Sequence, residues 1–143
     1  MNYIINQSTL FLEFKNNELV IEELDRSYTD SINNIKKILE KSCIYYGSTL
    51  KGRIAGSKNY IKGRYKMPII ISEKYKLIFF YIKDNDNNIF WFNFALIKDY
   101  QQINKNVKIE FANGKFKMIN ISYTIFNNQM LKSSRLLVIY TSR

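Results

Sequence analysis

The residues best suited to chemistry form a basic, glycine-containing stretch in the first half of the chain. Between Glu40 and Glu73 the sequence holds seven Lys and Arg residues and no acidic residue. Further along this stretch the cations alternate with Tyr60 and Tyr65. Cations neutralise phosphate oxygens and aromatic rings stack on bases, so the pattern is typical of a nucleic-acid interface. Solvated lysines beside core tyrosines would give the same sequence, but the absence of acidic residues favours the nucleic-acid interpretation.

Three glycines, Gly47, Gly52 and Gly56, occur at the beginning of this stretch. Glycine lets a backbone approach a partner closely and adopt dihedral angles that other residues avoid. Neighbouring serine and threonine hydroxyls add short hydrogen-bonding groups, so the segment can present N–H groups and cations to phosphate oxygens. A structural connector whose glycines serve turns explains the same residues equally well, and the sequence leaves both interpretations open.

Few residues could support catalysis. Histidine is absent, which excludes Ser-His-Asp and Cys-His mechanisms and any zinc site that uses histidine. The single cysteine, Cys43, excludes an intramolecular disulfide and a four-cysteine metal site, and it suits a reducing cytoplasm. No glycine-rich phosphate loop or metal-loop motif occurs. We therefore predict no catalytic residue, no metal and no cofactor; a small basic ribonuclease using Lys, Arg and Tyr is the one enzyme class left open.

Charge is distributed unevenly along the 143 residues, whose formal net charge is +10. Residues 1–30 carry a net charge of −4, and residues 31–143 carry +14. Such an imbalance creates a positive field that favours polyanionic partners. A soluble basic surface, or the Lys and Asn enrichment of an A·T-rich genome, is the simpler explanation. The longest apolar run, residues 77–82, is too short to cross a membrane and no targeting segment is evident, so we expect a soluble, cytoplasmic protein.

Hydrophobic patterns indicate which elements would position the basic stretch. Two short strands are expected at residues 9–14 and 18–24, around the turn sequence Lys15-Asn16-Asn17. Apolar residues then recur every three or four positions, which predicts an amphipathic helix over about residues 30–44 with Thr29 or Asp30 as its N-cap. Cys43 belongs to this apolar stripe, so we expect it to act as a small hydrophobic residue. No regular structure can be assigned between Gly47 and Gly63.

The pattern of the second half of the sequence predicts mainly strands. They are expected at 69–71, 77–83 and 89–97, and a β-hairpin at 107–118, where Asn113-Gly114 favours a type I′ turn. Ser122 is predicted to cap a C-terminal helix, and residues 136–140 fit either that helix or a strand. The prediction is one α+β domain over residues 1–143 with a mostly antiparallel sheet.

Several sequence blocks resemble the ComK family of competence transcription factors. The resemblance covers roughly residues 35–135 and rests on four blocks in matching order. They are Lys41-Ser42-Cys43 with Tyr46-Gly47-Ser48, Gly52-Arg53 and Ala55-Gly56; Lys66-Met67-Pro68-Ile69 with Phe79 and Trp91; Phe111-Ala112-Asn113-Gly114-Lys115; and Ile121-Ser122-Tyr123 with Gln129.

The resemblance implies a transcriptional activator of DNA-uptake genes, located in the cytoplasm on the nucleoid. Members bind A·T-rich boxes in double-stranded DNA, mainly through the minor groove, as homodimers that pair into tetramers. Narrow A·T-rich grooves concentrate negative potential and attract Arg and Lys, which suits this composition. Arg53 lies in a matched block, and local charge adds the other candidates. The predicted DNA contacts are Lys51, Arg53, Lys58, Lys62, Arg64 and Lys66.

Family members typically continue beyond the position of Arg143, and a proteolytic adaptor reads that tail. We therefore expect a short member that lacks the tail, which argues against control by the adaptor and leaves open whether the protein activates transcription. Two alternatives to an activator remain open. One is the basic ribonuclease toxin; the other is a non-activating, ComK-like interaction or inhibitor protein, whose acidic N-terminal region masks its own basic face.

Overall fold

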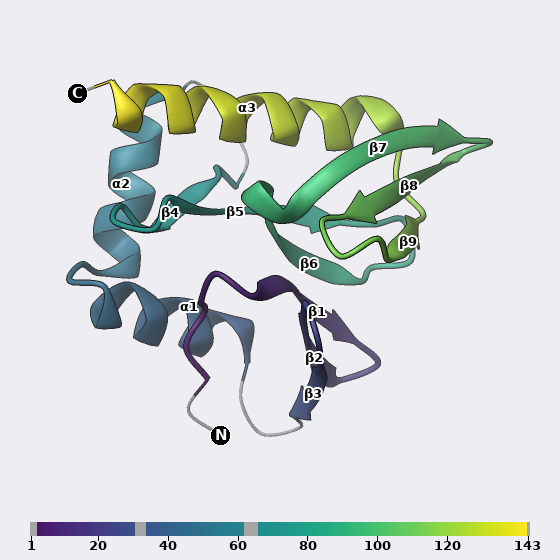
Figure 1. Cartoon of the computed structure of the whole chain (residues 1–143), viewed down its shortest axis with the longest axis horizontal. Helices are drawn as coiled ribbons and strands as arrows, with labels where there is room; N and C mark the ends of the chain where they lie inside the picture. The colour runs from purple at the N-terminus through teal and green to yellow at the C-terminus, as the bar shows by residue number, and fades with distance from the viewer. Residues whose placement is uncertain (1–2, 31–33, 62–65, 143) are drawn as a thin grey trace.

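The computed structural model describes residues 3–30, 34–61 and 66–142 (Figure 1). These residues form nine strands, three α-helices and one 3₁₀ helix, joined by turns and loops. In chain order the elements are β1 (Thr9–Lys15), β2 (Glu18–Glu23), β3 (Ser27–Asp30), α1 (Ile35–Tyr45), α2 (Leu50–Tyr60), β4 (Ile69–Ser72), β5 (Leu77–Lys83), β6 (Ile89–Asn93), η1 (Phe94–Leu96), β7 (Ile97–Ile103), β8 (Asn106–Phe111), β9 (Phe116–Ile119) and α3 (Tyr123–Thr141).

Two antiparallel sheets organise these elements. Six strands form the larger sheet in the order β3-β2-β1-β6-β5-β4, and β7-β8-β9 form the smaller one. The N-terminal strand β1 pairs with β6, so it lies in the middle of the larger sheet rather than at its edge. These sheets and helices confirm the predicted α+β fold with a mostly antiparallel sheet and a C-terminal helix after a hairpin.

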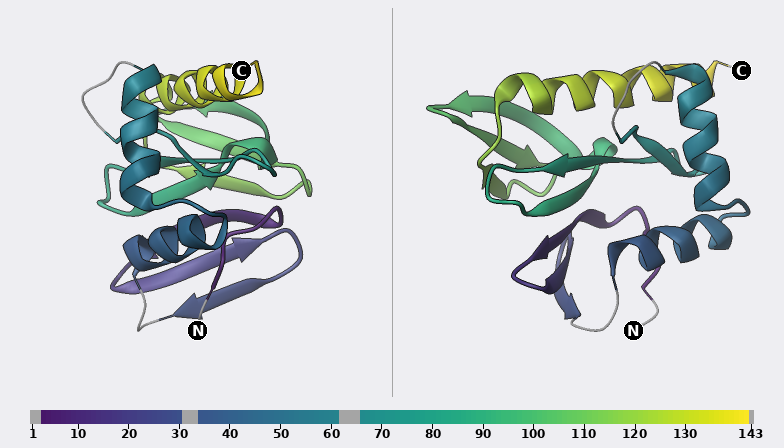
Figure 2. Two further views of the ribbon diagram at one scale, coloured as in Figure 1. Left: turned by 90° about the vertical axis from the view of Figure 1, so that its left-hand side faces the viewer. Right: turned by 180° about the vertical axis from the view of Figure 1, so that it is seen from behind.

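Alternating side chains of the larger sheet build a core on each of its faces. On one face Leu12, Phe79 and Trp91 pack against α1, which contributes Ile38 and Cys43. On the other face Phe11, Phe80, Phe90 and Phe92 pack against the smaller sheet and α3. Figure 2 shows α3 running along one side of the sheets and α1 lying on the opposite side. Because other elements pack on each of its faces, the larger sheet forms the centre of the molecule.

Two hydrogen bonds connect Ile5, which precedes β1, to α1 and its C-terminal end. The backbone N–H of Ile5 donates to Ser42 Oγ over 3.0 Å, and the Tyr46 hydroxyl donates to the carbonyl oxygen of Ile5 over 2.7 Å. Cys43, between them in the same helix, is fully buried in the core, as its apolar position predicts. Burial raises the pKa of its thiol to about 11, so the thiol stays protonated at neutral pH.

Glu23 forms a second tie to the N-terminal segment, and its carboxylate is almost completely buried. It accepts hydrogen bonds from the Tyr3 hydroxyl, from Arg26 Nε at 3.0 Å and from Asn6 Nδ2 at 3.4 Å. Burial on its own raises the pKa of this carboxyl, but the three hydrogen bonds outweigh it and lower the pKa below its ordinary value.

Replacing Glu23 by Gln should lower the free energy of unfolding by about 1–3 kcal/mol at pH 7, because charge-assisted hydrogen bonds are lost. The folded-state pKa lies below the unfolded value, so the stabilisation is present above the ordinary pKa of 4.5 and disappears as the pH falls through the folded pKa. Urea unfolding at pH 7 and at about pH 3 measures both effects. An equal cost at the two pH values would contradict this role of the carboxylate.

The predicted helix at residues 30–44 exists but begins later than its hydrophobic pattern indicates. The helix α1 begins at Ile35, with Asn34 as the N-cap that accepts from Lys37 N over 2.9 Å, so Thr29 and Asp30 as caps are wrong. Residues Ser27–Asp30 instead form β3. They are held by antiparallel pairing with β2, and this pairing with another strand is not visible in a local pattern. Ile32, part of the predicted stripe, lies outside the described residues.

Three further expectations are corrected. The unassigned stretch after Gly47 contains the helix α2, and the strand expected at residues 89–97 ends at Asn93, whose side chain accepts from Ala95 N and caps η1. The hairpin of β8 and β9 is confirmed, but its turn is not type I′, because Gly114 has a positive φ and Asn113 does not. Residues 136–140 belong to α3.

Candidate nucleic-acid interface

The helix α2 carries the centre of the predicted interface. It begins after Thr49, whose hydroxyl accepts from Gly52 N over 3.0 Å, and among its residues only Ser57 is buried. A helix with so little buried surface has no apolar stripe, which explains why the sequence pattern did not reveal it. In Figure 2, α2 stands at the side of the molecule between α1 and α3 and presents its outer face to solvent.

Two of the predicted contacts lie on this outer face. Lys51 and Lys58 are exposed and seven residues apart, so they lie about two turns apart on the same side of α2. Lys66, which precedes β4, is also exposed, and its Nζ lies 4.7 Å from the centroid of the Tyr81 ring. Within the described ranges, none of these three lysines forms an ion pair. Their ammonium groups are therefore available to an anionic partner.

Two other predicted contacts, Lys62 and Arg64, lie outside the described residues, between α2 and Lys66.

Arg53 differs from the lysines because its side chain is largely enclosed. Only 13% of that side chain is exposed, and its Nη1 lies 3.6 Å from Glu73 Oε1 in the turn between β4 and β5. Its Nε is buried without a hydrogen-bond partner among the described atoms. The structure therefore places Arg53 in the junction between α2 and the sheet, apart from the exposed lysines.

Replacing Arg53 by Ala should lower the free energy of unfolding by about 1–2 kcal/mol, because the enclosed aliphatic stem and the ion pair with Glu73 are lost. Replacing the exposed Lys51 by Ala should change it by about 0.5 kcal/mol or less. Urea denaturation followed by circular dichroism compares the two variants. Equal stability of both variants would show that Arg53 has no structural role.

The glycines of this region have structural explanations. Gly47 has a φ of +89°, which ends α1 in a conformation that favours glycine. A Cβ atom at Gly56 would lie 3.1 Å from the hydroxyl of Tyr140, so this glycine permits close packing of α2 against α3. Tyr60 packs on the same Tyr140 ring edge to face, with centroids 5.7 Å apart. These contacts favour the structural interpretation of Gly47 and Gly56 over that of a phosphate-binding loop.

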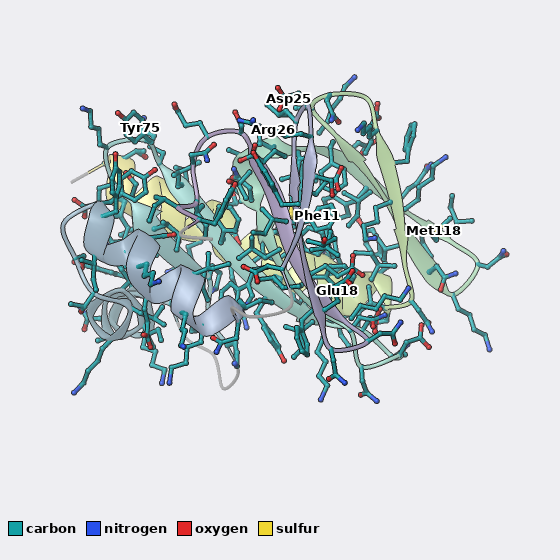
Figure 3. The ribbon with its side chains drawn as sticks, turned by 90° about the horizontal axis from the view of Figure 1, so that it is seen from below. Phe11, Glu18, Asp25, Arg26, Tyr75 and Met118 are labelled. Carbon is teal, nitrogen blue, oxygen red and sulfur yellow. The ribbon has the colours of Figure 1, made fainter. Side chains whose placement is uncertain are left out.

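The acidic N-terminal region lies away from the exposed lysines of α2. Its Glu13 and Glu22 pair with Lys117 and Lys115, at 3.3 Å and 3.9 Å. Figure 3 shows Glu18 and Asp25 at opposite ends of the β1–β3 region, beside the strands and not beside α2. Since β1 is also a central strand, the described residues 3–30 are an integral part of the fold and do not cover α2.

The structure adds residues that the sequence did not single out. Lys36 and Lys37 are exposed at the start of α1, and the polar side of the predicted amphipathic helix would have identified them. Gln129 of α3 is nearly buried, and its Nε2 donates to the carbonyl oxygens of Tyr81 at 2.7 Å and Lys66 at 3.2 Å. This amide fixes the backbone of Lys66 beside β5. No pattern in the sequence predicts that contact.

Two kinds of feature are absent from the described residues. No helix there is long and apolar enough to cross a membrane. No cluster of three or more Cys, Asp or Glu side chains that could hold a metal ion occurs in those ranges.

Comparison with known proteins gives two matches. A sequence model of the family described as "ComK protein" matches residues 1–143. The "Competence transcription factor" of Bacillus subtilis (strain 168) is 26% identical over 100 residues, which are 68% of this chain and 52% of that protein. The matched region thus spans about half the length of this curated relative. No solved structure matches the chain.

Proposed function

Because the chain belongs to the ComK protein family, we propose that it regulates the transcription of competence genes by binding double-stranded, A·T-rich DNA. The observation that carries this proposal is the exposed face of α2, where Lys51 and Lys58 lie without an ion pair among the described residues and Lys66 follows. The protein acts in the cytoplasm, on the nucleoid, as a binding protein and not as an enzyme.

Electrostatics supplies most of the affinity in this proposal. Each lysine that neutralises a phosphate releases condensed counterions, so the logarithm of the affinity falls by about 0.9 for each contact and each tenfold rise in salt. A preference for A·T-rich DNA then comes from the narrow minor groove, whose negative potential attracts Lys and Arg. Because the minor groove distinguishes little more than A·T from G·C, the spacing of the boxes supplies the remaining specificity.

The protein acts as a homodimer, with pairs of dimers on DNA. Two exposed apolar side chains of α3, Leu131 and Val138, support this part of the proposal. They are seven residues apart and therefore lie on the same side of the helix, 59% and 60% exposed. Light scattering of the purified protein with and without DNA measures the stoichiometry.

Fluorescence anisotropy with two labelled duplexes tests the proposal. One duplex carries paired A·T boxes, and the other has the same length with the boxes replaced by G·C. We expect the A·T duplex to bind more tightly by a factor of about ten or more. Equal, weak binding to both would contradict the proposal, and incubation with labelled RNA would then test the ribonuclease alternative.

A further inference from the structure

A groove of about 790 Å³ lies between α1, α2 and the adjacent face of the larger sheet. Its floor is formed by side chains of the sheet, including Phe14, Tyr81 and Trp91. Leu39 of α1 and Ile54 of α2 form its walls. Ile54 is 37% exposed although it is apolar and points into this groove. The helices therefore leave part of the apolar sheet face uncovered.

Positive charge surrounds the groove. Lys36 of α1, Lys58 of α2 and Lys66 before β4 are among its lining residues, and none of the described lining residues is acidic. On α2, Lys58 lies one turn after Ile54, so its ammonium group follows the apolar wall directly. Across the groove, the Lys66 Nζ lies over the ring of Tyr81, 4.7 Å from its centroid. An apolar cleft lined by cationic side chains attracts anions, and it retains those anions that also have an apolar part.

We propose that this groove binds a small anionic amphiphile, a single hydrocarbon chain that ends in a carboxylate. The chain lies on Trp91 and Phe14, and the carboxylate pairs with Lys58 and Lys66. The volume lies within the roughly 300–1,000 Å³ of small-molecule sites, which are mostly apolar with a few placed polar groups. A DNA backbone would pair with the lysines but would not contact the half-buried rings of Phe14 and Tyr81, which a hydrocarbon chain covers.

The ligand also has a consequence for regulation, and this consequence rests on the proposed function. Lys58 and Lys66 line the groove and are also among the proposed DNA contacts. A bound carboxylate neutralises positive charge there, so the amphiphile competes with DNA. The binding site itself does not depend on DNA, and the experiment below uses the protein alone.

Trp91 is the only tryptophan of the chain and lies in the floor of the groove, so its fluorescence reports occupancy directly. The probes are 11-bromoundecanoate, whose bromine quenches tryptophan on contact, and 11-bromoundecanol, which has the same chain without the charge. Both are titrated below the concentration at which they form micelles. We expect saturable quenching by the acid and binding of the alcohol that is weaker by about tenfold, because two ion pairs are missing.

Three variants locate the ligand. Lys58→Gln with Lys66→Gln should weaken binding of the acid about tenfold. The charge-matched control, Lys83→Gln with Lys105→Gln, should bind it as the unchanged protein does, because both lysines are exposed and neither lines the groove. Ile54→Glu, at a partly exposed position of α2, should abolish quenching while the circular dichroism spectrum is retained. Equal quenching by acid and alcohol, no saturable quenching, or undiminished binding in Ile54→Glu would overturn the proposal.

Discussion

Simultaneous replacement of Lys51, Lys58 and Lys66 by Gln should weaken binding to an A·T-rich duplex by about 100-fold at physiological salt. Each of these lysines is exposed and without an ion pair among the described residues, so each is free to neutralise one phosphate. Losing three contacts should also reduce the dependence of affinity on salt. The slope of log affinity against log salt should become about 2.7 less negative, at 0.9 for each phosphate.

A charge-matched control separates this effect from the loss of net charge. Lys15, Lys83 and Lys105 are exposed too, and none of them lies on a helix. Replacing these three lysines by Gln lowers the net charge by the same amount as the first triple variant, but most of the affinity for the A·T-rich duplex should remain. Anisotropy titrations at several salt concentrations compare the two triple variants. An equal loss in both would mean that net charge alone, and not the face of α2, binds DNA.

Phe126→Ala should lower the free energy of unfolding by about 3–5 kcal/mol, a large part of the 5–15 kcal/mol typical of a domain. Phe126 is fully buried and connects α3 to both sheets. Its ring lies 5.6 Å from that of Phe80, 5.9 Å from that of Phe92 and 5.2 Å from that of Tyr100. The truncation leaves a cavity between three layers that cannot all close around it.

The adjacent residue provides the control for this variant. Ile125 is 51% exposed on the same turn of α3, so Ile125→Ala should change stability by about 0.5 kcal/mol or less. Urea denaturation of both variants gives the comparison. A cost below about 1 kcal/mol for Phe126→Ala would show that α3 does not close the core as described.

Elements with a strong local pattern could be predicted from the sequence. The pair β1 and β2 flanks Asn16 and Asn17, which both have positive φ values and form the tight turn expected between the two strands. The strand β5 has the predicted bounds, because its residues are buried on both faces and form a continuous apolar run. The helix α1 is recognisable in the sequence because its apolar residues face the sheet and recur with a helical spacing. The pattern nevertheless indicates a start near residue 30, whereas the helix begins at Ile35.

Elements and contacts that depend on distant partners could not be predicted. The strands β3 and β7 are mostly polar and are held by pairing with β2 and β8. The helix α2 buries too little surface to show a stripe. The matched sequence block placed Arg53 among the predicted DNA contacts, whereas its side chain is largely enclosed and pairs with Glu73. The bonds from Gln129 to Lys66 and Tyr81 connect residues far apart in the chain, which composition and spacing do not reveal.

Site-directed DNA cleavage tests most directly whether α2 contacts DNA. An iron-chelate reagent is attached to Ala55→Cys, on the exposed face of α2, or to Asp25→Cys or Met118→Cys, which Figure 3 places away from that helix. Cys43 does not compete for the reagent, because it is buried and its thiol has a pKa of about 11. We predict cleavage within the A·T boxes from position 55 and none from 25 or 118. Cleavage from 25 or 118, with none from 55, would contradict the account.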